Sequence, residues 1–276
     1  GVDSQEIFFT SGGTGGDNWI LKGVAFEKRP DGNHIIVSNV EHPAVKNTAE
    51  WLKTQGFEVD FAPVDGDGFV IVSELEKLIR DETILVSIMA VNNEVGTIQP
   101  IDEISDLLAD KPTISFHVDA VQAIGKIPLE AWLTERVDFA VLSAHKFHGP
   151  RGVGIVVAKK GKRLTPLLHG GGQEHNWRST TENLAGIAAT SKALRLALDD
   201  DDFKRQKVRA MKQVILEELE KHRKVHVFSK VENFAPNILT FGIRGVRGEV
   251  VVHAFEQHEI YISTTSACSS KKNAAA

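Results

Sequence analysis

Short apolar runs alternate with amphipathic segments through much of the chain. Strands are predicted where the apolar residues are consecutive or alternate, at 7–10, 34–38, 57–63, 84–91, 114–118 and 137–142. Helical periodicity occupies the segments between them, at 19–26, 44–55, 73–79 and 101–108. Glu76 stands three residues after Ser73, which predicts a capping box at the start of the helix at 73–79. The run 84–91 is almost wholly apolar, as expected of a strand that helices cover on both faces. The alternation predicts an α/β fold with a mostly parallel, doubly wound sheet.

The C-terminal part of the chain has a different pattern. Residues 154–158 predict a hairpin-like neighbour of the strand at 137–142, and 184–198 and 203–222 predict long helices. The acidic cluster 199–202 between these helices is interpreted as a domain boundary. Three short strands at 225–228, 238–241 and 260–263, with a helix at 249–257, predict an α+β lobe. The domains are therefore expected to be a large one over 1–199 and a partial small one over 200–276.

Composition excludes several classes of function. The chain of 276 residues has no run of about eighteen apolar residues and no signal-peptide pattern, so a cytoplasmic location is expected, with no membrane partner. Its net charge of −5 is made of interspersed signs, which argues against direct nucleic-acid binding. Cys268 is the only cysteine, so neither an internal disulfide nor a multi-thiolate metal site is expected. That thiol is either buried and inert or reactive.

Polar and glycine residues follow five of the predicted strands, at the edge where ligands of such sheets bind. They are Gly12 to Thr14, His42, Asn93, Asp119 with Gln122, and Ser143 with His145 and Lys146. Each signal is weak alone, since a lone histidine is often structural and a strand-end aspartate can cap a helix. Their common location predicts one site.

Lys146 stands in a turn that follows the apolar run 137–142 and ends at Gly149 and Gly152. A lysine after a strand is usually a surface charge. A lysine amine is a nucleophile only where burial or neighbouring cations favour its uncharged form. We interpret Lys146 as a Schiff-base lysine, which requires an aldehyde from a cofactor.

The glycine-rich turn before the first helix is typical of a phosphate cradle, because backbone N–H groups at a helix start attract anions. The turn is not a dinucleotide fingerprint, since Asn18 stands where a glycine is needed, and a plain tight turn is the alternative. The run His169 to Gly172 suggests a lipase oxyanion loop, but the chain has no Gly-x-Ser-x-Gly elbow, so a hydrolase is rejected. Phosphate cradle, strand-end acid and lysine together predict a pyridoxal-phosphate pocket.

A series of motifs spread over nearly the whole chain supports this interpretation. They are Phe9 to Thr14, Glu41-His42, Val91 to Gly96, His117 to Gln122, Ser143 to Lys146, Gly170 to Glu174, Arg178 to Thr181 and Ser266 to Ser269. In these motifs the chain resembles the NifS/IscS-like cysteine desulfurases of the class V aminotransferase superfamily. The resemblance implies the fold-type I architecture and the cofactor pyridoxal 5'-phosphate.

Roles for individual residues follow from this resemblance. Lys146 would bind the cofactor and later move the α proton of the substrate, and Asp119 would pair with the pyridine nitrogen. His42 would stack on the cofactor ring and assist proton transfer. Gln122 and Asn93 would serve the phenolate side of the ring. The phosphate would be held by Gly13, Thr14, Ser143 and His145, with Thr181 reaching it from the other subunit of a homodimer.

The resemblance also assigns Cys268 as the persulfide cysteine, on a loop of small polar residues. L-cysteine would become L-alanine, and the sulfur would pass to Cys268 and then to an acceptor protein for iron-sulfur clusters or thionucleosides. Only the thiolate form can attack the sulfur. The alternatives are another enzyme of this fold, such as a selenocysteine lyase or an aminotransferase, and a catalytically incomplete fragment.

Two departures from the family pattern stand out. Gly15 and Gly16 replace a glutamate and a polar residue of many relatives, which predicts a loosely ordered helix start. Both ends of the chain are shorter than in the family, so it resembles a truncated member. The arginine that binds the substrate carboxylate is expected beyond the chain end, and none of Arg178, Arg244 and Arg247 is assigned to that role.

Overall fold

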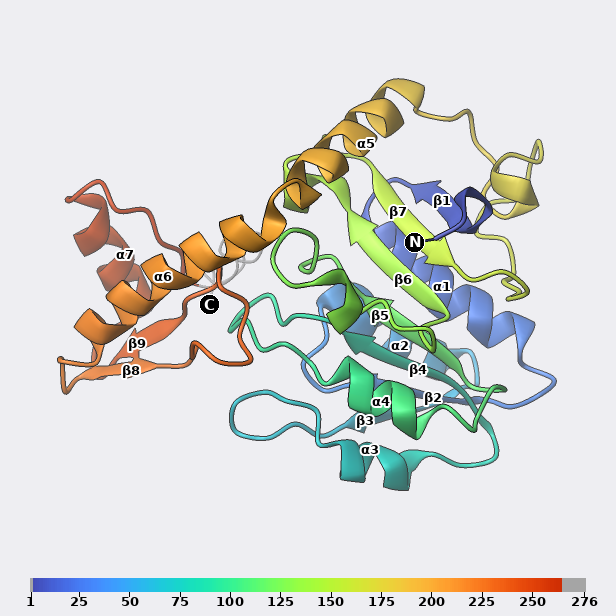
Figure 1. Cartoon of the computed structure of the whole chain (residues 1–276). Coiled ribbons are helices and arrows are strands. Elements are labelled where there is room, and N and C mark those ends of the chain that lie inside the picture. Colours follow the sequence, from blue (N-terminus) through green and yellow to red (C-terminus); the bar gives the residue numbers. More distant parts are fainter. Residues whose placement is uncertain (1, 265–276) are drawn as a thin grey trace.

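A seven-stranded sheet forms the centre of the protein (Figure 1), whose computed structural model describes residues 2–264. The strands are β1 (Ile7–Thr10), β2 (His34–Ser38), β3 (Glu58–Ala62), β4 (Thr83–Met89), β5 (Ser115–Asp119), β6 (Phe139–Ser143) and β7 (Gly154–Ala158). Their order is β1-β7-β6-β5-β4-β2-β3, and β7 alone runs in the direction opposite to the other six strands. The expectation of a mostly parallel sheet is therefore confirmed.

Helices cover both faces of this sheet. Helices α1 (Gly13–Glu27) and α2 (Pro43–Thr54) pack on one face, and α3 (Val72–Leu78), α4 (Ile101–Leu107) and α5 (Leu184–Leu198) pack on the other. Because successive side chains of a strand point to opposite faces, Ile35 and Val37 join the core under α1 and α2, whereas Ile36 joins the opposite core. The sheet is doubly wound, as the alternation of strands and helices predicts.

The start of α1 differs from the sequence prediction. The helix begins at Gly13 rather than at residue 19, and it is regular through Gly15 and Gly16, so the expected loosening of the helix start is wrong. A Cβ atom on Gly16 would lie 2.7 Å from Val141 Cγ1 and 3.1 Å from Val156 Cγ2. Glycine here lets the first turn of α1 lie directly against β6 and β7, and that contact orders the turn.

The helix α3 corrects a second prediction. Ser73 and Glu76 have capping-box spacing, but α3 begins at Val72 with Ile71 at its N-cap, and no side chain caps it. Ser73 lies inside the first turn. Four short 3-10 helices complete the large sheet region: η1 (Ser4–Glu6), η2 (Leu129–Ala131), η3 (Ala144–Phe147) and η4 (Glu174–Asn176).

A smaller lobe follows α5. It contains α6 (Asp201–Leu219), the antiparallel pair β8 (Val225–Val227) and β9 (Phe241–Ile243), and α7 (Gly248–Glu256). Asp200, with a φ of 48°, separates α5 from α6. The strand predicted at 238–241 lies later, at β9, and the strand predicted at 260–263 is wrong, because these residues are irregular. The division into domains at residue 199 stays a prediction.

The smaller lobe is connected to the sheet through the segment around Ala235. Its N–H donates to Gly96 O at 2.7 Å, and its carbonyl accepts from the Lys212 side chain at 3.0 Å. Lys212 on α6 is almost wholly buried, and burial lowers its pKa to about 8. These contacts place residues 237–243 beside the loop that follows β4.

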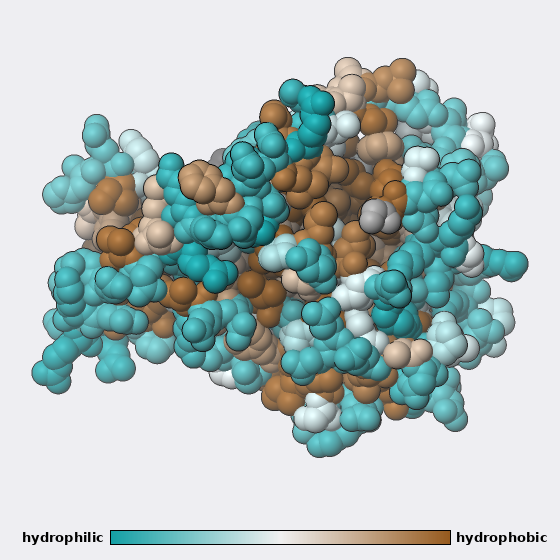
Figure 2. Space-filling model, viewed as in Figure 1, coloured by the Kyte–Doolittle hydropathy of each residue, from teal (hydrophilic) through white to brown (hydrophobic). Residues whose placement is uncertain are grey.

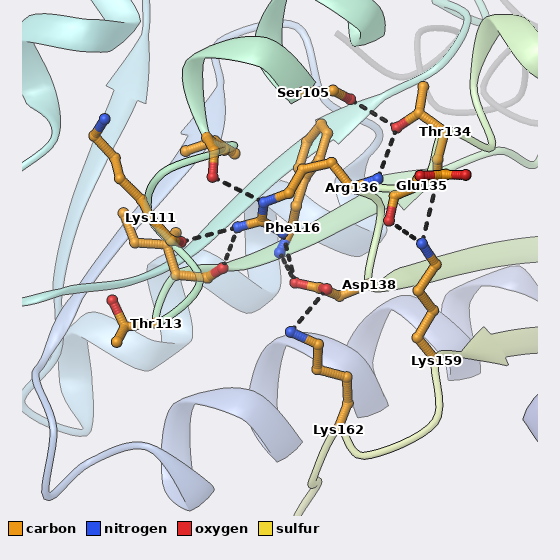
Figure 3. A network of polar contacts seen from close by, with 12 residues as sticks. Ser105, Lys111, Thr113, Phe116, Thr134, Glu135, Arg136, Asp138, Lys159 and Lys162 are labelled. Carbon is orange, nitrogen blue, oxygen red and sulfur yellow. Dashed lines mark hydrogen bonds and ion pairs between the residues drawn. The ribbon is translucent and has the colours of Figure 1, made fainter.

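A network of polar contacts lies at the amino edge of the sheet (Figure 3). The Arg136 guanidinium bonds Asp138 at 2.9 Å, and Lys162 bonds the other carboxylate oxygen of Asp138 at 2.8 Å. Asp138 also accepts from Phe116 N of β5 at 2.9 Å. Arg136 donates as well to three backbone carbonyls, those of Leu108, Lys111 and Ile114. The network joins β5 and β6 to the segment after α4.

Several large apolar side chains of α5 and α6 are exposed, among them Leu184, Phe203 and Val214. In Figure 2, hydrophobic side chains are visible in the hollow below α5, whereas the outer edges of the molecule are mostly hydrophilic. Contiguous exposed apolar surface is typical of regions that another protein segment covers. Among the described residues, every helix is too short or too polar to cross a membrane.

Candidate active site

The carboxyl ends of β1, β2, β4, β5 and β6 lie at one edge of the sheet, because these strands run in the same direction. At this edge lies a cavity of about 630 Å³ between the sheet and the smaller lobe. Asn93, Gln122 and Lys146 line it from the sheet side, and Asn237 and Tyr261 are among the residues that line it from the lobe. The structure therefore brings three of the predicted site residues into one cavity wall.

Lys146 lies in the 3-10 turn η3, directly after β6. Its side chain is half-buried and faces the cavity. The turn is closed by Gly149 N, which donates to Ala144 O at 2.8 Å, and a Cβ on Gly149 would lie only 2.9 Å from that oxygen. The glycine predicted to fix the exit of the turn is thus required for its closure.

The glycine turn before α1 lies against the ends of β5 and β6. A Cβ on Gly13 would lie 2.7 Å from Val121 Cγ2 and 3.4 Å from Ser143 Cβ. Ser143 Oγ is 2.9 Å from His145 Nδ1, so a hydroxyl and an imidazole lie beside the helix start. Burial, then Lys146 and Arg151, lower the pKa of His145. Backbone N–H groups of a helix start next to these side chains suit an anion.

Asp119, the last residue of β5, is 5% exposed. Its Oδ1 accepts from Val121 N at 3.0 Å. Burial raises the pKa of Asp119 to about 6, while the Val121 N–H and the positive charge of Lys146 oppose that rise. A cationic group held against this carboxyl would keep it ionised at neutral pH.

His42 is the N-cap of α2, where its Nδ1 accepts from Ala44 N at 3.1 Å. An accepting Nδ1 leaves the ring proton of the neutral imidazole on Nε2. Burial and then the charge of Lys146 lower the pKa of His42. His42 also lines a second, shallower cavity of about 340 Å³ together with Thr14. The structure thus provides a neutral imidazole close to the lysine.

Lys126 is a residue of the site that the sequence analysis missed. Its Nζ donates to Gln122 Oε1 at 2.7 Å, which leaves the Gln122 amide N–H groups as the donors at the cavity. Burial, then Lys146, lower the pKa of Lys126 to about 8. The spacing of four residues from Gln122 was the available signal, but it predicts a contact only where a helical turn forms.

The two asparagines after β4 have different environments. Asn92 is buried, donates to Val40 O at 3.1 Å and accepts from the N–H groups of Glu94 and Val95. Asn92 therefore shapes the loop. Asn93 is half-buried, and its amide donates to Glu94 at 3.0 Å while its side chain borders the cavity.

Two predicted site residues are not among those that the described part of the chain brings to the cavity. Thr181 is exposed in the loop before α5, and its contact with a second subunit stays a prediction. That loop is held to the sheet by Glu174, which accepts from Phe9 N at 3.1 Å, and by Trp177, which stacks on Phe8. Cys268 lies outside the described residues 2–264, and so does the loop assigned to it.

The residues at this edge fit pyridoxal phosphate by their chemistry. The cofactor has a phosphate, an aldehyde and a basic ring nitrogen, and the site offers a helix start with hydroxyls, a lysine amine and a buried acid. Gly13 has no side chain, so the start of α1 lies directly against Val121 and Ser143 at the ends of β5 and β6. The donor set therefore matches all three polar parts of the cofactor.

Comparison with known proteins points to the same class. The family Aminotransferase class-V matches residues 1–275. A "NifS/IcsS protein homolog" of Lactobacillus delbrueckii subsp. bulgaricus is 53% identical over 273 residues, covering 99% of this chain and 71% of the relative. "Cysteine desulfurase IscS" of Clostridium botulinum (strain Hall) is 42% identical, covering 98% of this chain and 68% of the relative. A solved NifS-like protein superimposes with a TM-score of 0.90 at 41% identity, covering 95% of this chain and 72% of the other.

Fold and site thus define a class V aminotransferase domain, a family of enzymes that depend on pyridoxal phosphate. Within that family, the chain belongs to the NifS/IscS-like cysteine desulfurases. The resemblance inferred from the sequence motifs is confirmed.

Proposed function

We propose that this chain is a pyridoxal-phosphate-dependent cysteine desulfurase that converts L-cysteine to L-alanine and transfers the sulfur to Cys268. The observation that carries the proposal is the convergence of a lysine, a buried acid, a neutral imidazole and a helix start at one edge of the sheet. The cavity beside Lys146 is the place for the substrate.

The residues of the site divide the work. Lys146 would hold the cofactor covalently, Asp119 would hold its ring nitrogen, and the start of α1 would hold its phosphate, helped by Ser143 and His145. When bound, pyridoxal phosphate draws electrons from the α carbon of an attached amino acid. Lys146 Nζ then accepts the proton from that carbon, and His42, which carries its proton on Nε2, assists proton transfer near the ring.

Sulfur transfer is assigned to Cys268. Its thiolate attacks the sulfur of the substrate, so that an S–S bond forms while the C–S bond breaks. The electron pair of the broken bond stays on the carbon side and is protonated, which yields the methyl group of alanine. The product on the enzyme is a persulfide, which passes its outer sulfur to an acceptor protein for iron-sulfur cluster or thionucleoside synthesis.

The working enzyme is proposed to be a cytoplasmic homodimer, with Thr181 reaching the phosphate of the other subunit. Support comes from the exposure of Thr181 on a loop held at β1, and from the exposed apolar side chains of α5 and α6. Neither nucleic acid nor membrane is proposed as a direct partner.

A spectrum and a product assay test the proposal together. The purified chain with pyridoxal phosphate should show a near-visible band that borohydride reduces onto Lys146, located by mass spectrometry. With L-cysteine and a reductant it should release alanine and sulfide in equal amounts. Cys268→Ala and Cys268→Ser should keep the band and lose sulfide release.

Each contrary result has a distinct meaning. Unchanged sulfide release in both Cys268 variants would overturn the persulfide role of that thiol. Formation of a keto acid in place of alanine would identify an aminotransferase. Absence of the band in the folded chain would contradict the cofactor assignment.

A further inference from the structure

Three buried polar atoms near the site have no hydrogen-bond partner among the described residues. They are Asp17 Oδ1 on α1, His117 Nε2 on β5 and Glu41 Oε2 on the turn after β2. Asp17 and His117 are 1% and 0% exposed, and these two unpartnered atoms lie 3.6 Å from each other. Buried polar groups without partners are rare in native proteins, so this arrangement calls for a physical reason.

The pair Asp17–His117 links the two elements that would hold opposite ends of the cofactor. Asp17 lies one helical turn after Gly13, at the proposed phosphate end. His117 lies two residues before Asp119 on β5, so both side chains point to the same face of the sheet. The other ring nitrogen of His117 is 2.8 Å from Ser87 Oγ on β4, which fixes the ring.

Charge around the pair favours a neutral state. The groups that act on Asp17 are two further buried acids, Asp119 and Glu41, and both disfavour its ionisation. Burial above all, then Asp119 and Glu41, raise the pKa of Asp17 well above its usual range. Burial lowers the pKa of His117 to about 3. These shifts favour a protonated Asp17 carboxyl beside a neutral His117, whose second ring nitrogen is then free to accept a hydrogen bond.

We propose that Asp17 and His117 are positioning residues for Asp119, forming a neutral pair in which the protonated Asp17 carboxyl donates to His117 Nε2. A shift of about half an ångström in the Asp17 side chain brings its Oδ1 to hydrogen-bond distance from His117 Nε2. His117 Nδ1–H donates to Ser87 Oγ in the same arrangement. The pair fixes the first turn of α1 against β5.

The neutral pair has a consequence for Asp119. Asp17, Glu41 and Asp119 are three acids buried close together. Lys146 is the cation that favours ionisation of Asp119. Glu41 accepts from Ser38 Oγ and Met89 N, and burial raises its pKa to about 8, so it too is protonated at neutral pH. Asp119 is left as the one acid of the three that ionises when a cationic ring nitrogen binds. This part of the inference rests on the proposed function.

Asp17→Asn and Asp17→Leu separate the hydrogen bond from the charge. Asparagine is neutral and can donate its amide N–H to His117 Nε2, whereas leucine leaves that nitrogen unpartnered. Pyridoxal-phosphate affinity should stay within about threefold of the wild type in Asp17→Asn and fall about tenfold or more in Asp17→Leu. Leu21→Ala, a cavity variant one turn further along α1, is the control for general destabilisation. It should lower the urea midpoint yet keep the affinity within about threefold of the wild type.

The imidazole itself gives a readout that needs no cofactor. Long-range ¹H–¹⁵N NMR of the protein without cofactor should show His117 as the neutral Nδ1–H form from pH 6 to 8, with its resonance assigned by its loss in His117→Gln. The Nε2 resonance should move in Asp17→Leu because the donor is gone.

The outcomes separate this inference from the proposed function. Equal affinities in Asp17→Leu and the wild type would overturn the positioning role. An Asp17→Asn variant as weak as Asp17→Leu, or a charged His117 at pH 7, would overturn the neutral pair. An equal loss of pyridoxal-phosphate affinity in Leu21→Ala would show that the loss in Asp17→Leu comes from general destabilisation, and would overturn the positioning role. Failure of the wild type to bind pyridoxal phosphate would contradict the proposed function, while the NMR result would still decide the state of the pair.

Discussion

The two edges of the central sheet handle buried charge in opposite ways. At the amino edge, both carboxylate oxygens of Asp138 are ion-paired, one with Arg136 and the other with Lys162. At the carboxyl edge, Asp17 and Glu41 each have a buried oxygen without a hydrogen-bond partner among the described residues. Strand β5 contributes to both edges. At its amino end Phe116 N donates to Asp138, and at its carboxyl end Asp119 lies in the site.

This contrast indicates a division of labour along the strands. Paired and hydrogen-bonded charges hold one geometry, and breaking such a buried pair is costly. Acids held in a low dielectric without partners have displaced pKa values, which is the condition for binding a cationic cofactor or moving a proton. We therefore expect substitutions at the amino edge to affect stability and substitutions at the carboxyl edge to affect function.

The largest effect is expected at Lys146. Lys146→Ala should reduce sulfide release on the order of 10⁴-fold or more, because the covalent anchor and the proton acceptor are lost together. The free energy of unfolding without cofactor should change by less than about 0.5 kcal/mol, since the side chain is half-buried. Turnover assays measure the loss of sulfide release, and urea unfolding measures the change in the free energy of unfolding. A large loss of stability would break the contrast between the edges.

Arg136→Met tests the opposite edge. It removes the ion pair with Asp138 and the donors to three backbone carbonyls, so unfolding should become easier by about 3 kcal/mol. The folded variant should keep its cofactor band and its turnover at low temperature. Arg163→Met, an exposed arginine, is the matched control and should have little effect on the urea midpoint. A variant with normal stability would contradict the structural role of the network.

Glu41→Gln sharpens the contrast through pH. Burial raises the pKa of Glu41 from 4.5 to about 8, so between these values the folded chain holds a proton that the unfolded chain has released. Protonated Glu41 therefore stabilises the folded chain at low pH, and this stabilisation is lost as pH rises towards 8. Between pH 6.5 and 8, the wild type should lose stability more steeply than Glu41→Gln, by on the order of 1 kcal/mol. Urea midpoints at both pH values measure this, with the exposed Glu50→Gln as the control. Parallel slopes would show that Glu41 is already ionised.

A smaller effect than those at Lys146 and Arg136 is expected at Lys126. Lys126→Met removes the hydrogen bond that orients the Gln122 amide, so KM for L-cysteine or the cofactor affinity should worsen by roughly tenfold. Lys126→Arg should recover part of the loss, because it can still donate to Gln122. Kinetics and cofactor titration of both variants decide the matter. Wild-type values of KM and cofactor affinity in Lys126→Met would show that Lys126 has no role in the site.

Sequence reasoning reached most of the fold for a physical reason. A parallel strand between two helix layers is continuously apolar, and β2, predicted at 34–38, has these bounds in the structure. The rule that ligands lie beyond the carboxyl ends of strands then placed Asn93, Gln122 and Lys146 together without any distance information. Their chemical roles stay predictions.

Other features depend on contacts that no local pattern contains. The early start of α1 depends on Gly16 fitting against Val141, which is distant in sequence. The capping-box spacing at Ser73 is present, but the helix begins one residue earlier, so the side chain lies inside the turn. The partners of Arg136 include backbone carbonyls of three residues, and any sequence supplies carbonyls. Tertiary contacts decided the cases of Gly16 and Arg136.

The position of β1 has a consequence for the order in which the protein folds. β1 pairs with β7, so that Ile7 lies opposite Val157 and Thr10 opposite Gly154. The turn that would cradle the phosphate follows β1 directly, yet its strand has no ladder partner until residues 154–157 have been synthesised and have paired with β6. Closing so long a loop is entropically costly and slow. A ribosome-bound chain that stops short of β7 would therefore lack an ordered phosphate turn, and cofactor capture belongs to the late stage of folding.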